Sequence, residues 1–179
     1  MPGMIFGLAS SPLVDAGIQY PRSRPIPMVI RPCLDRRQAG VIGKGLSRWA
    51  IVHIDDTADL IALVWDAIVT NSNKAGHGWE GFYIVANDEL SVYDLAKETG
   101  RVMKELGLSS SDEVTTFTPE EVLKYFPHGM DLFFGANSRG RGTHSFALGW
   151  KPKYTGKDYL ASFKDEVEAI LKGTGRDAL

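Results

Sequence analysis

A short apolar run that passes directly into an amphipathic segment constrains the fold of this 179-residue chain most strongly. Residues 51–54 read Ile-Val-His-Ile, and residues 57–69 carry apolar side chains at helical spacing. Two carboxylates, Asp55 and Asp56, stand between them. A buried strand that feeds an amphipathic helix is the repeating unit of α/β proteins. We therefore expect a strand that ends at 54 and a helix over 57–69, with Asp55 and Asp56 as its cap and turn residues.

The rest of the chain alternates between apolar runs and helical patterns. Further strands are expected at 4–8, 40–43, 82–86 and 114–117, and further helices at 26–37, 91–106, 119 onwards, 130–136 and 157–172. Pro32 should kink or break the first of these helices. The run 82–86 is apolar throughout, which is typical of a strand covered on both faces of a parallel sheet. The pattern predicts a mixed α/β fold.

Helix starts and loops are marked by individual residues. Ser91 should cap one helix, and Thr118, Pro119 and the glutamate at 121 together predict the start of another. Residues 9–25 are expected to form a long irregular loop, and 71–78 a polar turn. We predict one domain over 1–172 and a flexible tail over 173–179.

Composition narrows the classes of partner. The net charge of −2 gives no reason to expect nucleic acid or an anionic membrane as a partner. Cys33 is the only cysteine, which excludes an intrachain disulfide and a thiolate metal cluster, and we interpret it as a small apolar residue on a helix face. The histidines show no metal-ligand spacing. No apolar run approaches the roughly 20 residues that span a bilayer, and a cytoplasmic protein is expected.

Three segments together resemble one known family. They are residues 2–7 (Pro-Gly-Met-Ile-Phe-Gly), residues 43–60 and residues 148–152 (Leu-Gly-Trp-Lys-Pro). The chain resembles the extended short-chain dehydrogenase/reductases, and among them the NAD-dependent epimerase/dehydratase-like proteins common in fungi. The resemblance implies the C-terminal part of a Rossmann-type doubly wound sheet together with a small substrate-binding lobe. Members of the family carry a nucleotide-binding half first, and by resemblance this chain begins after it.

The resemblance also implies site residues. Pro2, Gly3 and Met4 match the strand that passes beside the nicotinamide ring, which implies backbone contact with the carboxamide of NAD or NADP. Arg48 and Arg139 stand where sugar-nucleotide members place basic contacts to the substrate. A guanidinium group suits this role because its planar fork binds phosphate or carboxylate through two hydrogen bonds. Arg141 is interpreted as surface charge.

Two further motifs are not assigned to catalysis. The family uses a tyrosine and a lysine four residues later, and Tyr93 and Lys97 have this spacing. By resemblance, however, their helix lies in a region of packing residues, so we expect an amphipathic surface there. The glycines of residues 40–45 have the spacing GxxGxG rather than the dinucleotide pattern, and they predict a turn between two strands. The catalytic residues are left unassigned.

Three functions are compatible with these observations. The first is an NAD(P)-dependent oxidoreductase or epimerase-like protein that binds a small-molecule substrate and is represented here by its substrate-binding half. The second is a non-catalytic lobe that binds a small molecule or a partner, or that stems from an incomplete gene model. The third is a repurposed isomerase without redox chemistry. A sheet cut in this way would expose an edge and an apolar face, so self-association or pairing through the edge is expected.

Overall fold

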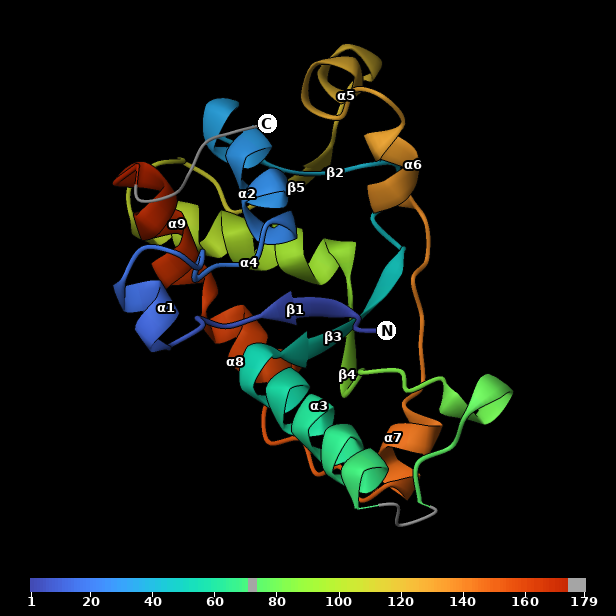
Figure 1. Ribbon diagram of the computed structural model, residues 1–179. Coiled ribbons are helices and arrows are strands. Elements are labelled where there is room, and N and C mark those ends of the chain that lie inside the picture. The colour runs from blue at the N-terminus through green and yellow to red at the C-terminus, as the bar shows by residue number, and fades with distance from the viewer. Residues whose placement is uncertain (71–73, 174–179) are drawn as a thin grey trace. The chain divides into compact units, whose positions relative to one another are not determined.

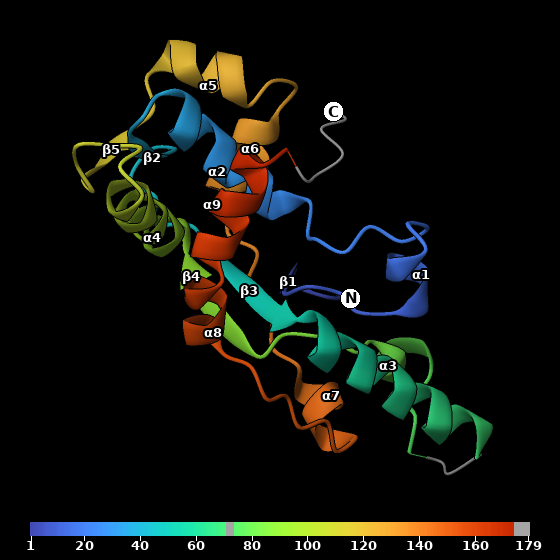
Figure 2. The ribbon, with the colours of Figure 1, turned by 90° about the vertical axis from the view of Figure 1, so that its left-hand side faces the viewer.

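The computed structural model describes residues 1–70 and 74–173 and divides the chain into two compact units. The first unit contains residues 1–23, 49–89 and 138–159, and the remaining segments form the second. Figures 1 and 2 show the elements from two sides. Residues 174–179 of the expected tail, and 71–73 of the expected polar turn, lie outside the described part of the chain.

Short parallel strands and one long helix form the first unit. Strand β1 (Met4–Phe6) pairs in parallel with β3 (Arg48–His53), and β4 (Asp88–Ser91) completes the order β1-β3-β4. Helix α3 (Ile54–Val69) starts directly where β3 ends, as Figure 1 shows. This arrangement confirms the predicted strand-to-helix unit. The smaller elements are α1 (Pro12–Asp15), the 3-10 turn η1 (Gly78–Gly81), α7 (Thr143–Ala147) and the start of α8 (Gly156–Ala161).

The core of the first unit joins segments that are far apart in the sequence. Val52 of β3, Leu60 of α3, Val85 and Trp150 are buried together, and Ile5, Leu63 and Val64 pack against them. Burial of an aliphatic side chain of this size stabilises the fold by about 1.5–3 kcal/mol. Trp150, from the Leu-Gly-Trp-Lys-Pro segment, is 3% exposed and packs in this cluster.

Helices surround a two-stranded sheet in the second unit. Strands β2 (Ala39–Val41) and β5 (Val114–Thr116) pair in parallel, and both contact α4 (Val92–Glu105). Helices α2 (Pro25–Asp35) and α9 (Phe163–Leu171) contact α4 and each other. Helices α5 (Pro119–Tyr125) and α6 (Met130–Gly135) follow β5.

Both predicted helix caps of this unit are confirmed. The Ser91 hydroxyl accepts a hydrogen bond from the Asp94 N–H at 3.1 Å, and the Asp94 carboxylate accepts the Ser91 N–H at 3.0 Å. Thr118 and Glu121 form the same reciprocal pair, at 3.3 and 2.9 Å. Such boxes satisfy backbone donors that have no partner inside the helix.

Arg36, directly after α2, connects that helix with β5 and α5 in the second unit. Its Nε lies 3.3 Å from a Glu121 carboxylate oxygen, and its Nη2 donates to the Thr115 hydroxyl at 2.8 Å. The guanidinium also lies over the Phe117 ring, 4.8 Å from the ring centre. A Cβ atom at Gly40 would stand 2.5 Å from Nη1, so the arginine packs where glycine leaves room.

The strand predicted over 82–86 was wrong. Only Val85 forms a bridge there, to Pro2. The reason lies in the neighbouring carbonyl groups, which bond to side chains of α7 instead of to a strand. Ser145 donates its hydroxyl hydrogen to the Ile84 oxygen at 2.7 Å, and the His144 ring lies 3.2 Å from the Phe82 oxygen.

Two helix predictions also need correction. The helix expected over 157–172 is divided at Ser162 into α8 and α9. Pro32 does not break α2, which continues to Asp35. A proline so near the end removes a single hydrogen bond from a ladder that is about to stop.

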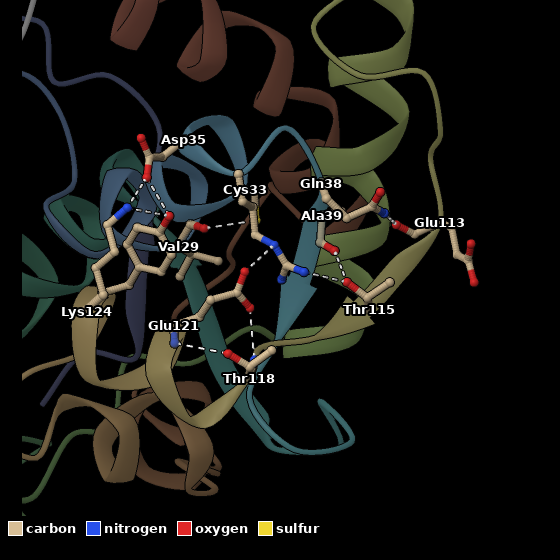
Figure 3. Close-up of polar contacts among 12 residues, drawn as sticks. Val29, Cys33, Asp35, Gln38, Ala39, Glu113, Thr115, Thr118, Glu121 and Lys124 are labelled. Carbon is tan, nitrogen blue, oxygen red and sulfur yellow. Dashed lines mark hydrogen bonds and ion pairs between the residues drawn. The ribbon is translucent and has the colours of Figure 1, made fainter.

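Cys33 lies fully buried on α2, as its interpretation as a small apolar residue predicts. Its thiol donates a weak hydrogen bond to the Val29 oxygen at 3.4 Å, drawn in Figure 3. Burial raises the pKa of the Cys33 thiol from its ordinary value of 9.0 to about 11. The native thiol is therefore protonated and unreactive at neutral pH.

We expect Gly100→Ala to destabilise the protein, although the same change in an exposed helix stabilises by about 1 kcal/mol. The new Cβ would stand 2.8 Å from the Asp112 oxygen and 3.0 Å from the Ala39 Cβ, so α4 would have to move. Urea unfolding should show a loss of about 1–3 kcal/mol. The matched change Lys97→Ala, on the exposed face of α4, should stay within about 0.5 kcal/mol. Equal stability of the two variants would contradict this packing.

Cys33 predicts a pH dependence that its replacement removes. Because the folded-state pKa is raised above the unfolded value, stability from the protonated thiol is complete below pH 9 and is lost as the pH rises toward 11. The loss reaches about 2–3 kcal/mol at about 1.36 kcal/mol per pKa unit. Urea unfolding of wild type and Cys33→Ala at several pH values from 8 to 11 isolates this contribution. Parallel pH profiles for the two proteins would show that the thiol does not contribute.

Candidate functional site

Polar side chains gather where β3 passes into α3. The cap of α3 is His53, whose ring Nδ1 accepts the Asp55 N–H at 3.2 Å. The helix thus starts three residues earlier than expected, which corrects the assignment of Asp55 and Asp56 as cap residues. Both acids fall in the first turn instead, where negative charge is stabilised by the helix dipole.

Asp56 holds a distant segment in place. Its side chain is fully buried, and its two oxygens accept the backbone N–H groups of Lys153 at 2.9 Å and Tyr154 at 3.1 Å. Its backbone oxygen accepts the indole N–H of Trp150 at 2.8 Å. We call these four residues the Asp56 clamp. It fixes residues 150–155, which form no helix or strand, against the start of α3.

His53 is enclosed by rings. Its imidazole stacks on Tyr154 with 3.7 Å between ring centres and meets the edge of Phe6 at 5.1 Å. A Cβ atom at Gly7 would stand 2.2 Å from His53 Nε2, so only glycine fits beside the ring. Gly7 also has a φ of 93°, a conformation that glycine adopts without strain. His53 therefore caps α3 and packs against the rings of Phe6 and Tyr154.

The segment proposed to contact a nicotinamide is tightly packed. The Gly3 N–H donates to the Val85 oxygen at 2.9 Å, and a Cβ atom at Gly3 would stand 2.4 Å from the Ala50 oxygen. Met4 is buried, and its sulfur accepts the Tyr159 hydroxyl at 3.0 Å. Pro2 is exposed. The Gly3 N–H is thus already committed inside the protein.

The two predicted substrate arginines belong to different units. In the second unit, Arg48 is exposed at the start of β3, and its N–H donates to the Asn137 side-chain oxygen at 2.8 Å. In the first unit, the Nε–H of Arg139 donates to Glu89 at 2.6 Å. The Arg139 side chain is 65% exposed, so the guanidinium remains accessible to a ligand.

The other sequence motifs occupy the expected places. Tyr93 and Lys97 are exposed on α4. The glycine-rich residues 40–45 lead from β2 through a turn into β3, with the Gly45 N–H bonded to the Ile42 oxygen at 3.1 Å. This confirms a turn between strands rather than a loop that opens a helix.

Another lysine and tyrosine, Lys124 and Tyr125, are adjacent on α5. Lys124 donates to Asp35 at 2.6 Å, as Figure 3 shows, and Tyr125 donates to the same carboxylate oxygen. The hydrogen bond to Asp35 raises the pKa of Tyr125, whereas the hydrogen bond from Lys124 lowers the pKa of Asp35. A phenol that acts as an acid–base catalyst near neutral pH needs the opposite shift. This cluster is a surface contact between α2 and α5.

The described residues contain neither a metal site nor a membrane-spanning helix. Within 1–70 and 74–173, no group of three or more His, Cys, Asp or Glu side chains is placed to hold a metal ion. No helix in the same residues is long and apolar enough to cross a membrane.

Sequence reasoning missed the two contacts that organise this region. The partners of Asp56 lie 94–98 residues away, and Glu89 lies 50 residues from Arg139. The adjacent acids 55–56 and the Leu-Gly-Trp-Lys-Pro segment both stand out in the sequence, but no local pattern indicates that they contact each other.

We expect Asp56→Asn to cost about 2–3 kcal/mol of unfolding free energy, because one buried backbone N–H would then face an amide NH₂ instead of an oxygen. Asp59→Asn is the matched control, since the ion pair of Asp59 with Lys153 at 3.2 Å is exposed and should be worth under about 1 kcal/mol. Thermal and urea unfolding compare the two variants. A loss for Asp56→Asn no larger than that for Asp59→Asn would contradict the clamp.

The chain was compared with known proteins. No protein-family model and no curated protein sequence matches it. Among solved structures, it is similar to the PbgP3 protein from Burkholderia pseudomallei, with 17% identity, a TM-score of 0.54, and coverage of 89% of this chain and 42% of that one. It is also similar to a UDP-glucose 4-epimerase from Thermotoga maritima solved with UDP-glucose, with 17% identity, a TM-score of 0.54, and coverage of 97% and 45%.

A third similar structure is a UDP-N-acetylglucosamine 4-epimerase from Methanobrevibacter ruminantium in complex with UDP-N-acetylmuramic acid. The identity is 13%, the TM-score 0.51, and the coverage 96% of this chain and 45% of that one. The chain therefore spans less than half the length of these three structures. At such identities the likeness concerns the fold, and it confirms the predicted class: a mixed α/β chain with parallel strands, as in the Rossmann-like epimerases.

Proposed function

We propose that these residues form the substrate-binding half of an NAD(P)-dependent oxidoreductase or epimerase of the short-chain dehydrogenase/reductase type, with a sugar nucleotide as the small-molecule substrate. The fold likeness to two UDP-sugar epimerases, over 96–97% of this chain, carries the proposal. Two of the similar structures were solved with UDP-glucose and UDP-N-acetylmuramic acid, which suggests the substrate class.

Arg48 and Arg139 are each proposed, separately, as a basic contact to the substrate, and for Arg48 the contact is to its diphosphate. Both side chains belong to exposed residues, and a guanidinium can bind a phosphate through two parallel hydrogen bonds. Glu89 supports this role for Arg139, because the carboxylate holds the Nε–H and so orients the rest of the planar group. An oriented guanidinium loses less conformational entropy when it binds an anion.

Pro2, Gly3 and Met4 are the proposed cofactor contacts. Since the Gly3 N–H is bonded to Val85, the contact to a carboxamide would use backbone oxygens of these residues, which can accept from its NH₂ group. Bound NAD or NADP would supply hydride transfer. In this proposal the dinucleotide loop and the catalytic tyrosine and lysine are supplied from outside residues 1–179, and the protein acts in a cytoplasmic setting. Pairing through a sheet edge stays a prediction.

A non-catalytic lobe that binds a small molecule or a partner is the second candidate. One observation favours it: two of the titratable groups nearest the end of β3 already have structural roles. His53 caps α3 and stacks on Tyr154, and Asp56 is buried in the clamp. The two candidates share a substrate site and differ in whether hydride transfer occurs when a dinucleotide-binding polypeptide is supplied.

Calorimetric titration of the chain with UDP-glucose tests the substrate site. We expect saturable binding that Arg48→Ala and Arg139→Ala each weaken by about 10–100-fold, the loss typical of a charged hydrogen bond. Arg141→Ala is the matched control and should leave the affinity unchanged. Absence of binding, or binding that neither of the first two variants weakens, would contradict the substrate class.

A parallel titration with NADH and NADPH tests whether residues 1–179 bind the dinucleotide by themselves. We expect no saturable binding in the micromolar range, because among the described residues the glycine-rich turn leads into a strand and offers no helix start to the pyrophosphate. Micromolar binding of either nucleotide would overturn the part of the proposal that places the dinucleotide loop outside these residues.

A further inference from the structure

Helix α3 exposes a row of large apolar side chains. Ile61, Trp65, Ile68 and Val69 are each 55–64% exposed. Their spacing of four, three and one residues puts them on one side of the helix. Leu60 and Ala67, on the other side, are buried in the first unit. We call the four exposed residues the α3 apolar face.

Such a face differs from scattered exposed hydrophobic residues. Single exposed leucines or isoleucines are ordinary, but a contiguous apolar patch marks an interaction site. Tryptophan is the residue type most enriched among those that dominate binding energy. The row from 61 to 69 rises about 12 Å along the helix axis, which matches about two turns of a partner helix.

The charged side chains that α3 itself carries all have one sign. Residues 54–69 contain four aspartates and no lysine or arginine. Asp56 is buried in the clamp, whereas Asp55, Asp59 and Asp66 are exposed. Among the residues that the structure describes, Asp59 is the one of these three with an ion pair to a lysine, and its partner Lys153 is itself exposed. The rim of the face is therefore acidic.

This rim decides between possible occupants. A second copy would bring the same acidic rim against itself, and like charges opposite each other are destabilising. An anionic membrane selects helices with lysine and arginine on the polar face, which is the opposite pattern. A helix with an apolar row between basic side chains meets both requirements, since its apolar row covers the tryptophan and its cations meet the aspartates.

We propose that the α3 apolar face is a docking surface for an amphipathic helix with a lysine- or arginine-rich rim, carried by another polypeptide. Burial of the four side chains supplies the affinity, and the acidic rim selects the partner. The proposal goes beyond the proposed function, because it involves neither the substrate arginines nor the backbone of residues 2–4.

The test uses two synthetic helical peptides of about 18 residues, long enough to cover the face. Both carry the same leucine pattern, with lysine at every polar position in one and glutamate in the other. Fluorescence anisotropy of labelled peptide should show micromolar binding of the lysine peptide and none of the glutamate peptide. Trp65→Ser and Ile68→Ser should each weaken the binding at least about tenfold. Leu132→Ser, at an exposed leucine on α6 in the second unit, should not.

A charge reversal sharpens the test. Asp66→Lys should weaken binding of the lysine peptide and allow the glutamate peptide to bind. Circular dichroism should show that the fold of this variant is unchanged. Binding of the two peptides with equal affinity, or binding insensitive to Trp65→Ser and Ile68→Ser, would overturn the proposal. So would a dimer in sedimentation equilibrium that Trp65→Ser dissociates, or binding to phosphatidylserine vesicles that Trp65→Ser abolishes. A substrate titration that fails leaves this result unaffected.

Discussion

A single buried carboxylate organises the first unit. Asp56 loses its water on folding, and that loss is tolerated because both oxygens accept backbone N–H groups, from Lys153 and Tyr154. Hydrogen bonds to a charged group contribute about 1.5–3 kcal/mol each. The indole of Trp150 bonds to the backbone of the same aspartate while its ring fills the core beside Val52. One residue thereby connects the strand-to-helix junction, an irregular segment and the apolar core.

The clamp matters for function because it places a segment that β4 also holds. Two consecutive residues of β4, whose side chains point to opposite sides of the strand, each hold a different segment. Asp88 accepts the Gly156 N–H at 2.8 Å, which anchors the segment that follows the clamp. Glu89 accepts from Arg139, which sets the direction of a proposed substrate contact. Arg139 is therefore oriented by β4, the same strand that anchors the segment following the Asp56 clamp.

Local signals in the sequence predicted most of the elements, because they act within a few residues. Ser91 and Thr118 bond to the third residue after them, so their caps could be recognised directly. The hydrogen bonds of the Asp56 side chain and of the Ile84 carbonyl are made to partners more than 60 residues away, and no periodicity in the sequence indicates such contacts. The apolar run 82–86 therefore predicted a strand, although side chains of α7 occupy the carbonyl groups that a neighbouring strand would need. For the candidate site, the sequence indicated Arg139 by resemblance but not the glutamate that orients it.

Hydrogen exchange at individual amides tests the central role of Asp56 most directly. The Lys153 and Tyr154 amides lie in a segment without helix or strand, where exchange is ordinarily fast. If the buried carboxylate holds them, both amides and the Trp150 indole N–H should exchange as slowly as the amides in the centre of β3. Exchange of these three groups at the rate of the exposed Lys151 amide would contradict the account.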